Sequence, residues 1–481
     1  MTIDLATIIK AYDVRGTVPD QLSPDVARAI GAAFARVVAA PEGAGRVVVG
    51  HDMRDSGPEL VDAFTAGVTA AGIDVVRIGL CSTDGLYHAS GALDAPGAMF
   101  TASHNPAVYN GIKLCRAGAR PVGQDTGLAD VRELAQRLLD DPSSVEPVEP
   151  VGVSTGSTTD ADTLADYAAF LRGLVDLSGI RPLKVVVDAG NGMAGHTVPA
   201  VLGTGAGLPA LPLDIVPLYF ELDGTFPNHE ANPLEPANLR DLQAAVVEHD
   251  ADLGLAFDGD ADRCFVVDQH GDPVSPSAIT ALVGLREVAK ELEAGRTPTV
   301  IHNLITSRAV PDLLQAAGAT TVRTRVGHSF IKAQMAQHDA VFGGEHSAHY
   351  YFRDFFFADT GMLAALHVLA ALGGQPHALS VLGEMYSPYV ASGEINSTVA
   401  DAAAATARVR EAYDAAYPQA DVDQLDGLTV AHWDGHPQWW FNLRASNTEP
   451  LLRLNVEAAD EDIMVKVRDD VLSLVRQTEE A

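Results

Sequence analysis

The stretch RVVVGHDMRDSGPELVDAFTAGVTAAGIDVVRIG, residues 46–79, decides the fold of this chain. It opens with a run of valines, passes through a polar turn and a helical pattern, and ends in a second apolar run. The same order recurs in residues 183–228 (LKVVVDAGNGMAGHTVPAVL, then LDIVPLYFELDGTFPN) and in PTVIHNLITSRAVPDLLQAAGATTVRTRVG, residues 298–327. Continuous apolar strands that alternate with helices predict repeated α/β domains with mixed, mostly parallel sheets.

Each repeat closes with one more apolar strand that runs into an unusual polar loop. The three stretches are GAMFTASHNPAVYNGIKL (97–114), ADLGLAFDGDADRCFVVD (251–268) and DAVFGGEHSAHYYF (339–352). Ligands of open α/β sheets gather at the loops beyond the strand ends. We therefore expect each of the three related domains to present one functional loop.

Composition suggests where these domains end. Residues 140–162 are rich in Pro, Ser, Thr and Glu, which is typical of a surface linker. The last part of the chain has helical patterns at 402–417 and 461–477 around alternating apolar stretches, which predict a small antiparallel sheet with helices. The predicted organisation is three α/β domains followed by a smaller α+β C-terminal domain, with the ranges 1–150, 151–272, 273–388 and 389–481.

Charge and composition exclude several classes of partner. The 481 residues carry 64 acids against 32 bases, a net charge of −32, and such a surface repels nucleic acid and anionic membranes. No apolar run reaches the roughly 18 residues of a membrane span, and residues 362–372 are better read as a buried helix. The N-terminal stretch lacks a signal-peptide pattern, and three cysteines without metal-like spacing suggest a reducing compartment. We expect a cytoplasmic protein, a monomer or a weak homodimer.

The motif DGDADR places carboxylates at alternate positions, Asp258, Asp260 and Asp262. In an extended or turning loop, this spacing can aim three hard oxygen ligands at one Mg²⁺. Without a cation, three carboxylates this close would repel one another. The calcium-hand pattern is absent, because no glutamate stands at its twelfth position. The alternative is a solvated acidic turn.

The motif RASNTEP, residues 444–450, offers a guanidinium group, two hydroxyls and an amide. Such donors suit a phosphate group. A helix N-cap is the competing interpretation, with Glu449 in the first turn. The following residues 451–454 alternate poorly for a helix, which favours the phosphate site.

Two further loops carry candidate side chains with more than one interpretation. In TASHNP the pair Ser103-His104 is either an ordinary turn or a reactive hydroxyl beside an imidazole. In GGEHSAHYYF the carboxylate of Glu345 and the hydroxyl of Ser347 could hold vicinal sugar hydroxyls. The histidines beside them, at 346 and 349, are either site bases or half-buried structural residues.

The motifs TASHNP, DGDADR, GEHSAH and RASNTEP, in this order and in these domains, resemble the α-D-phosphohexomutase superfamily, and within it the bacterial phosphomannomutase/phosphoglucomutase group. YDVRG, residues 12–16, adds to a resemblance that spans the whole chain. It implies domains arranged around a central cleft and an isomerase that interconverts mannose 1-phosphate and mannose 6-phosphate, and also the glucose phosphates. Mg²⁺ would be the cofactor and a hexose 1,6-bisphosphate the intermediate and activator.

The resemblance also assigns roles to the chemistry-bearing residues. Ser103 matches the serine that carries the phosphoryl group, and its oxygen would complete a Mg²⁺ site made by Asp258, Asp260 and Asp262. The residues that match groups around the transferring phosphoryl are His104, Lys113, Arg263 and His349.

A second set of matches concerns substrate binding. Glu345 and Ser347 match the pair that orients the sugar. The residues that match the site of the phosphate that is not transferred are Arg15, His328, Arg444, Ser446, Asn447 and Thr448.

The sequence departs from the family pattern at two places. His346 stands where many relatives have Met, and the lysine often found near the start of the third domain is absent, with Arg308 as a candidate replacement. A phosphoglucosamine mutase is the nearest alternative, but its phosphate loop usually has Gly in place of Asn447. From other classes, a serine-dependent metal phosphatase and a non-catalytic sugar-phosphate binding protein remain open.

Overall fold

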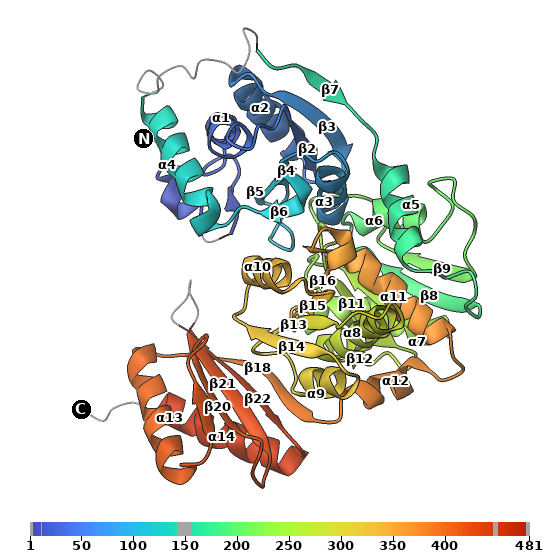
Figure 1. The fold of residues 1–481 in the computed structure, drawn as a ribbon, viewed down its shortest axis with the longest axis vertical. Coiled ribbons are helices and arrows are strands. Elements are labelled where there is room, and N and C mark those ends of the chain that lie inside the picture. The colour runs from blue at the N-terminus through green and yellow to red at the C-terminus, as the bar shows by residue number, and fades with distance from the viewer. Residues whose placement is uncertain (1–2, 11, 142–154, 446–450, 478–481) are drawn as a thin grey trace. The chain divides into compact units, whose positions relative to one another are not determined.

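The computed structural model describes residues 3–10, 12–141, 155–445 and 451–477 (Figure 1). The chain divides into two compact units, Met1–Val274 with Ser347–Ser380, and Ser275–His346 with Val381–Ala481. The first unit contains two complete sheets and a further antiparallel pair of strands, and the second unit contains three parallel strands and a complete antiparallel sheet. Among the described residues, no helix has the length and apolar character needed to cross a membrane.

The first sheet of the first unit is built around the valine-rich strand β2, whose residues Val47, Val48 and Val49 are fully buried. Its strand order is β1-β5-β4-β2-β3-β7, and β6 pairs with β5. Strands β3 and β4 run parallel to β2, while β5 runs antiparallel to β4. The strands are β1 (Val14–Thr17), β2 (Arg46–His51), β3 (Asp74–Leu80), β4 (Gly97–Phe100), β5 (Tyr109–Arg116), β6 (Arg120–Pro121) and β7 (Thr158–Asp160).

Two of the helices in this domain pack closely because glycines face the neighbouring backbone. A Cβ atom at Gly31 would lie 2.3 Å from the carbonyl oxygen of Phe64, and one at Gly67 would lie 2.1 Å from that of Arg28. These contacts join α1 to α2, the helix that the 46–79 stretch predicts. The helices are α1 (Pro24–Phe34), α2 (Gly57–Ala70), α3 (Thr83–Ala92) and α4 (Leu128–Asp140).

The predicted surface linker 140–162 is in part a strand. Strand β7 pairs in parallel with β3 at the edge of the first sheet. Gly156 permits this approach, since a Cβ atom there would lie 2.1 Å from the carbonyl oxygen of Ile73. A three-residue edge strand gives no periodic signal, which is why composition alone indicated a linker; residues 142–154 lie outside the described residues.

The second sheet of the first unit repeats the same central arrangement. Its order is β12-β11-β10-β8-β9, with β9 and β10 parallel to β8, and β11 antiparallel to β10. The strands are β8 (Leu183–Asp188), β9 (Leu213–Leu218), β10 (Leu253–Phe257), β11 (Cys264–Asp268) and β12 (Pro273–Val274), with helices α5 (Leu164–Leu174), α6 (Ala194–Val201) and α7 (Arg240–Glu248).

A later part of the chain returns to this first unit. It comprises the antiparallel pair β16 (Tyr350–Phe352) and β17 (Ala358–Asp359), followed by α11 (Gly361–Gly373). Nearly every residue of α11 is buried, which confirms the buried apolar helix predicted at 362–372.

In the second unit, β14 and β15 run parallel to β13, so the βαβ arrangement occurs a third time. These elements are α8 (Pro276–Glu293), β13 (Thr299–Asn303), α9 (Ala309–Ala316), β14 (Thr320–Thr324), α10 (His328–His338), β15 (Phe342–Gly344) and α12 (Leu379–Tyr386).

The rest of the second unit is an antiparallel sheet in the order β18-β22-β21-β20-β19. Its apolar face packs with helices α13 and α14 around Trp439, Phe441 and Leu454. The elements are β18 (Val390–Thr398), α13 (Ala402–Ala416), β19 (Asp421–Asp423), β20 (Leu428–His432), β21 (Trp439–Ala445), β22 (Leu451–Ala458) and α14 (Glu461–Arg476).

The fold class predicted from the sequence is confirmed: three α/β domains with mixed sheets precede an α+β domain. The central strands of the three α/β repeats are β2, β8 and β13. One of the two parallel neighbours of each leads into a candidate loop, and these neighbours are β4, β10 and β15. Strand β22 follows RASNTEP, so the helix N-cap interpretation of that motif is wrong. The domain boundaries stay predictions.

Candidate active site

Ser103 lies in the loop after β4 with its hydroxyl directed at a buried carboxylate. Its Oγ donates to Oδ2 of Asp258 at 2.8 Å, across 155 residues of sequence. The backbone of Ser103 has φ 49°, in the left-handed region that non-glycine residues rarely occupy. The predicted loops of the first two domains therefore meet at this hydroxyl, within the first unit.

The carboxylates of DGDADR are fully buried in the loop between β10 and β11. The loop approaches the Ser103 backbone so closely that a Cβ atom at Gly259 would lie 2.5 Å from the Ser103 carbonyl oxygen. The ammonium group of Lys113 donates to Oδ2 of Asp260 at 2.7 Å and to Oδ2 of Asp262 at 2.5 Å. The interpretation of this motif as a solvated turn is therefore wrong.

The donor set of these carboxylates fits a divalent cation. One oxygen from each of Asp258, Asp260 and Asp262 lies within 4.8 Å of the others. Lys113 uses the Oδ2 atoms of two of them, while Oδ1 of Asp260 and Oδ1 of Asp262 are buried without a hydrogen-bond partner among the described residues. Buried carboxylate oxygens without donors are costly, and a hard cation would satisfy them.

The pKa values show how strongly these charges interact. Burial raises the pKa of Asp258 above its ordinary value, against the opposing effect of Arg263. Burial also favours protonation of Asp260, but Lys113 and the hydroxyl of Thr83 together hold the pKa of Asp260 below its ordinary value. The centre therefore concentrates negative charge that cationic side chains only partly neutralise.

Arg263 and His104 complete the surroundings of the Ser103 hydroxyl. Arg263 donates from Nε to Oδ2 of Asp258 at 2.9 Å, and its Nη2 donates to Ser103 Oγ at 3.4 Å and to Nδ1 of His104. Burial, reinforced by Arg263 and Arg15, lowers the pKa of His104 to about 2. The imidazole is therefore neutral at physiological pH, and its Nδ1 accepts from the guanidinium group.

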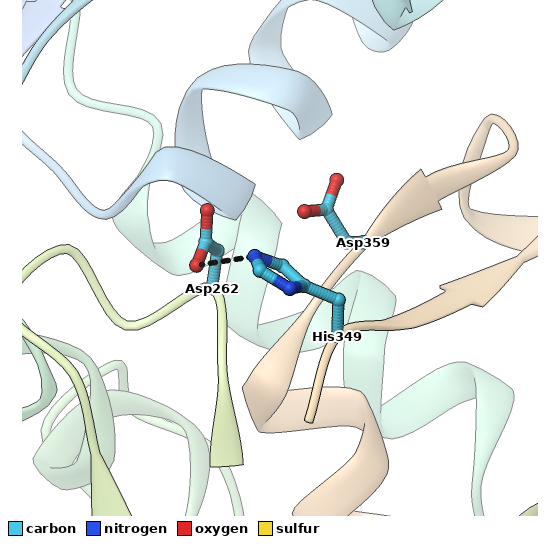
Figure 2. Close-up of side chains that lie close together, drawn as sticks. All are labelled: Asp262, His349 and Asp359. Atoms are coloured by element: carbon cyan, nitrogen blue, oxygen red, sulfur yellow. Dashed lines mark ion pairs between the residues drawn. The ribbon is translucent and has the colours of Figure 1, made fainter. Parts of the chain in front are cut away.

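His349 approaches the same centre from the segment before β16, as Figure 2 shows. Its Nε2 lies 3.6 Å from Oδ1 of Asp262, and Asp359 stands beside the pair. The hydroxyl of Ser347 lies 3.1 Å from Nδ1 of His349 and fixes the other side of the ring. Strand-like pairing of Arg263 with His349 anchors this segment to the loop between β10 and β11.

The three loops that meet at this centre each contain a non-glycine residue in left-handed conformation. These are Ser103, Ala261 between two of the carboxylates, and Ala348 between Ser347 and His349. Such residues cost on the order of 1–3 kcal/mol each and persist where their surroundings fix them, which is typical of functional sites.

Arg15, on β1, contacts the segment of residues 101–109 that contains Ser103, called the serine loop below. Its Nη1 donates to the carbonyl oxygen of Ala102 at 3.2 Å and to Oδ1 of Asn105, and Nε pairs with Asp13 at 2.8 Å. Pairing of Arg15 with Gly111 in β5 brings YDVRG beside NGIKL. The structure thus gathers Arg15, Ser103, Lys113, the carboxylates, Arg263 and His349 in one unit.

The other predicted substrate residues belong to the second unit. Oε1 of Glu345 accepts from the side-chain amide of Asn303 at 3.2 Å and from the backbone N–H of Gly327 at 3.3 Å. His346 is half-buried, and its Nδ1 lies 3.1 Å from the hydroxyl of Ser277.

Arg444 stands at the end of β21 with loosely held partners. Its Nη1 lies 3.7 Å from Asp426 and its Nη2 lies 4.0 Å from Glu394. Its Nε is buried without a hydrogen-bond partner among the described residues. Ser446, Asn447 and Thr448 lie outside the described residues, as does the side chain of His328.

Sequence reasoning missed several residues that hold this site. Thr83, at the start of α3, donates from its hydroxyl to Oδ2 of Asp260 at 2.6 Å. Asp52 and Arg54 form a buried ion pair beneath the serine loop, and Asp359 joins His349. For Asp52 and Arg54 the available signal was their position directly after β2, at the strand end where ligands of such sheets gather.

Comparison with known proteins identifies the relatives of this fold. The chain matches the family described as phosphoglucomutase/phosphomannomutase with all of its domains: α/β/α domain I at residues 6–138, domain II at 165–271, domain III at 275–389 and the C-terminal domain at 394–474.

Individual relatives cover almost the whole chain. A phosphomannomutase of Escherichia coli is 39% identical over 474 residues, which are 98% of this chain and 99% of the relative. The phosphohexose mutases of Xanthomonas campestris pv. campestris are 41% identical over 466 residues, 96% of this chain and 98% of theirs. A crystal structure of a phosphoglucomutase/phosphomannomutase family protein from Burkholderia thailandensis superposes with a TM-score of 0.84 at 30% identity and covers 98% of both chains.

Proposed function

The chain belongs to the phosphoglucomutase/phosphomannomutase family, and we propose that it interconverts mannose 1-phosphate and mannose 6-phosphate, and also the corresponding glucose phosphates. The observation that carries this proposal is the Ser103 hydroxyl, which lies 2.8 Å from the buried carboxylate of Asp258 and 3.4 Å from Nη2 of Arg263, while Lys113 contacts the neighbouring carboxylates. A hydroxyl needs such surroundings to exchange a phosphoryl group.

In the proposed reaction Ser103 starts as a phosphoserine. The bond between phosphorus and Ser103 Oγ breaks, a bond from phosphorus to a sugar hydroxyl forms, and that hydroxyl gives up its proton to a base. The product is a hexose 1,6-bisphosphate and a free serine. After the bisphosphate turns around, its other phosphate returns to Ser103 and releases the isomeric monophosphate.

Asp258, Asp260 and Asp262 would hold Mg²⁺ together with an oxygen of the phosphorylated serine. When bound, Mg²⁺ supplies positive charge to the transferring phosphoryl group. Arg263 and Lys113 supply fixed charge at the same place and hold the carboxylates in position. Arg263 is held by Asp258 before transfer begins, and charge that is fixed in advance in this way lowers the barrier.

Substrate recognition is proposed to use a separate set of groups. Glu345 and Ser347 orient the sugar hydroxyls, and His349 lies next to the transferring group. The phosphate that is not transferred is held by Arg15, His328, Arg444, Ser446, Asn447 and Thr448.

The proposed use of both sugars follows from the difference between them. Mannose and glucose differ only at the C2 hydroxyl, and strong discrimination needs a dedicated polar partner for that group. The family resemblance assigns Glu345 and Ser347 to the hydroxyls at C3 and C4, which the two sugars share. We therefore expect kcat/KM values for the two 1-phosphates that agree within about two orders of magnitude, a difference below about 3 kcal/mol.

Phosphorus NMR of the products tests the proposal. The enzyme is incubated with Mg²⁺, a trace of hexose 1,6-bisphosphate, and mannose 1-phosphate, glucose 1-phosphate or glucosamine 1-phosphate in parallel. Formation of the 6-phosphates of mannose and glucose supports it. Release of inorganic phosphate would indicate a metal phosphatase, preference for the glucosamine phosphate would indicate a phosphoglucosamine mutase, and no conversion would indicate a binding protein.

A cytoplasmic location and a monomeric or weakly dimeric state are part of the same proposal. All three cysteines are buried as thiols, which suits a reducing compartment. Sedimentation at several protein concentrations would distinguish a monomer from a dimer.

A further inference from the structure

The left-handed backbone conformation of Ser103 persists only if contacts with other residues stabilise it. A serine relaxes readily to an ordinary conformation unless its surroundings fix both sides of the residue. The N–H of Ser103 donates to the hydroxyl oxygen of Thr101 at 2.8 Å. Its carbonyl oxygen accepts from Nη2 of Arg54 at 3.0 Å. Both peptide groups that flank the Ser103 side chain are therefore tied to other residues.

Arg54 binds the whole serine loop rather than a single atom of it. Its guanidinium group is buried and donates to further backbone carbonyl oxygens of the loop, those of Asn105 at 2.7 Å, Pro106 at 3.0 Å and Tyr109 at 2.9 Å. Only a planar group with several fixed donors can satisfy so many acceptors at once. The loop's own backbone hydrogen bonds, from Asn105 to Ala102 and from Tyr109 to Pro106, leave the carbonyl oxygens of Ser103 and Asn105 to Arg54.

Asp52 anchors this guanidinium group to the first sheet. Its Oδ2 accepts from Nε of Arg54 at 3.3 Å, and its backbone N–H donates to the carbonyl oxygen of Phe100 at 2.9 Å. The hydroxyl of Thr101 lies beside the same carboxylate and lowers its pKa, against the larger opposing effect of burial. Ser103 is thus linked to Asp52 through Thr101 on its amino side and through Arg54 on its carbonyl side.

We propose that Arg54 is a positioning residue, which holds Ser103 in its left-handed conformation and so aims the hydroxyl at Asp258. This inference rests on the proposed function, because it assumes that Ser103 carries the phosphoryl group. Arg54 acts through the serine backbone and contacts none of the reacting atoms. Its contribution belongs to phosphoryl transfer, and substrate binding, or metal binding by the three aspartates of the dephosphorylated enzyme, should not depend on it.

The first test replaces Arg54 by Lys. The ammonium group preserves the charge opposite Asp52 but has only three donors at one point, so the loop carbonyls lose partners. We expect kcat to fall by about 100-fold or more, the size of effect that a small misplacement of a reacting group produces. KM should stay within about threefold of wild type, and so should the Mn²⁺ dissociation constant of the dephosphorylated enzyme. Arg77→Lys, an exposed arginine of the same sheet, is the matched control.

A second variant separates positioning from a loss of folding. Arg54→Ala leaves a space that free guanidinium can enter, and millimolar guanidinium should restore part of the Arg54→Ala activity while leaving Arg77→Ala unchanged. Hydrogen exchange supplies a readout without turnover: in Arg54→Lys, amides of residues 101–109 should exchange faster, with the rest of the first unit unchanged.

Particular results would overturn the inference. One is an Arg54→Lys enzyme with wild-type kcat. Another is a loss of activity that accompanies faster exchange throughout the unit and does not respond to guanidinium, since Arg54 would then serve only folding. If the wild-type enzyme itself converts no hexose phosphate, the proposed function fails, and the exchange result alone still decides whether Arg54 orders the loop.

Discussion

The charges around Ser103 and those around Arg444 are held in different ways. In the first unit, Arg263 and Asp258 are buried and only 2.7 Å apart, and Lys113 contacts two carboxylates at similar distances. In the second unit, Arg444 keeps 15% of its side-chain surface exposed and lies 3.7 and 4.0 Å from its acidic partners.

The difference indicates that one region stabilises the transferring group and the other binds substrate. Buried, closely paired charges are costly to move and provide a fixed field for a transferring group. Charges whose partners lie 3.7 Å or more away gain little from these partners and can exchange them for a phosphate at small cost. Changes in the first region should therefore lower kcat, whereas changes at Arg444 should raise KM. The predictions below test this division, beginning with the largest effect.

Ser103→Ala should abolish the covalent step. We expect a loss of at least about 10⁴-fold in kcat, because the substitution removes the hydroxyl that carries the phosphoryl group in the proposed reaction. Steady-state assays with mannose 1-phosphate measure the effect, and Ser178→Ala, a surface serine of the same unit, is the control. Activity of Ser103→Ala within tenfold of wild type would remove the serine from the reaction.

Asp260→Asn should weaken metal binding and turnover together. The substitution removes one ligand charge and leaves Lys113 with a single carboxylate, so we expect about a 100-fold loss in both metal affinity and kcat. Titration with Mn²⁺ gives the affinity, and Mg²⁺ dependence of the rate gives the turnover. Asp272→Asn, an exposed aspartate after β11, is the control, and full activity of Asp260→Asn at low Mg²⁺ would refute the metal assignment.

Arg444→Ala should affect substrate binding instead. Loss of one charge-assisted contact costs about 1.5–3 kcal/mol, which corresponds to an increase in KM of roughly 10- to 150-fold. We expect kcat at saturation to change less than about fivefold. Arg410→Ala, an exposed arginine on α13, is the matched control. A fall in kcat with an unchanged KM would contradict the assignment of Arg444 to substrate binding.

His346→Met tests the smallest predicted effect. The ring of His346 is tied to Ser277 and borders a cavity of about 210 Å³ that also reaches Tyr389. We expect the ratio of kcat/KM for the mannose and glucose 1-phosphates to shift by less than about tenfold. The contact with Ser277 occupies His346, so this histidine should not serve as a dedicated partner of the C2 hydroxyl. A wild-type ratio beyond a thousandfold that collapses in the variant would instead make His346 the specificity residue.

Local patterns predicted the residues whose partners lie within one motif. The alternation in DGDADR was enough to place three carboxylates together, and valine runs were enough to predict the repeated βαβ units. Arg54 and Thr83 were not predicted, because their partners lie about 50 and 177 residues away in the sequence. In HDMRDSG, Asp52 and Arg54 look like the polar start of a helix, and only the folded sheet brings them beneath Ser103.

Phosphoryl transfer to Ser103 tests the central claim most directly. Dephosphorylated enzyme is incubated with a hexose 1,6-bisphosphate and Mg²⁺, and intact-mass and peptide mass spectrometry then count and locate the phosphoryl groups. The account predicts one group per chain, on Ser103, which disappears when excess hexose monophosphate is added and is absent in Ser103→Ala. A catalytically active enzyme that carries its phosphoryl group on another residue, or on none, would contradict it.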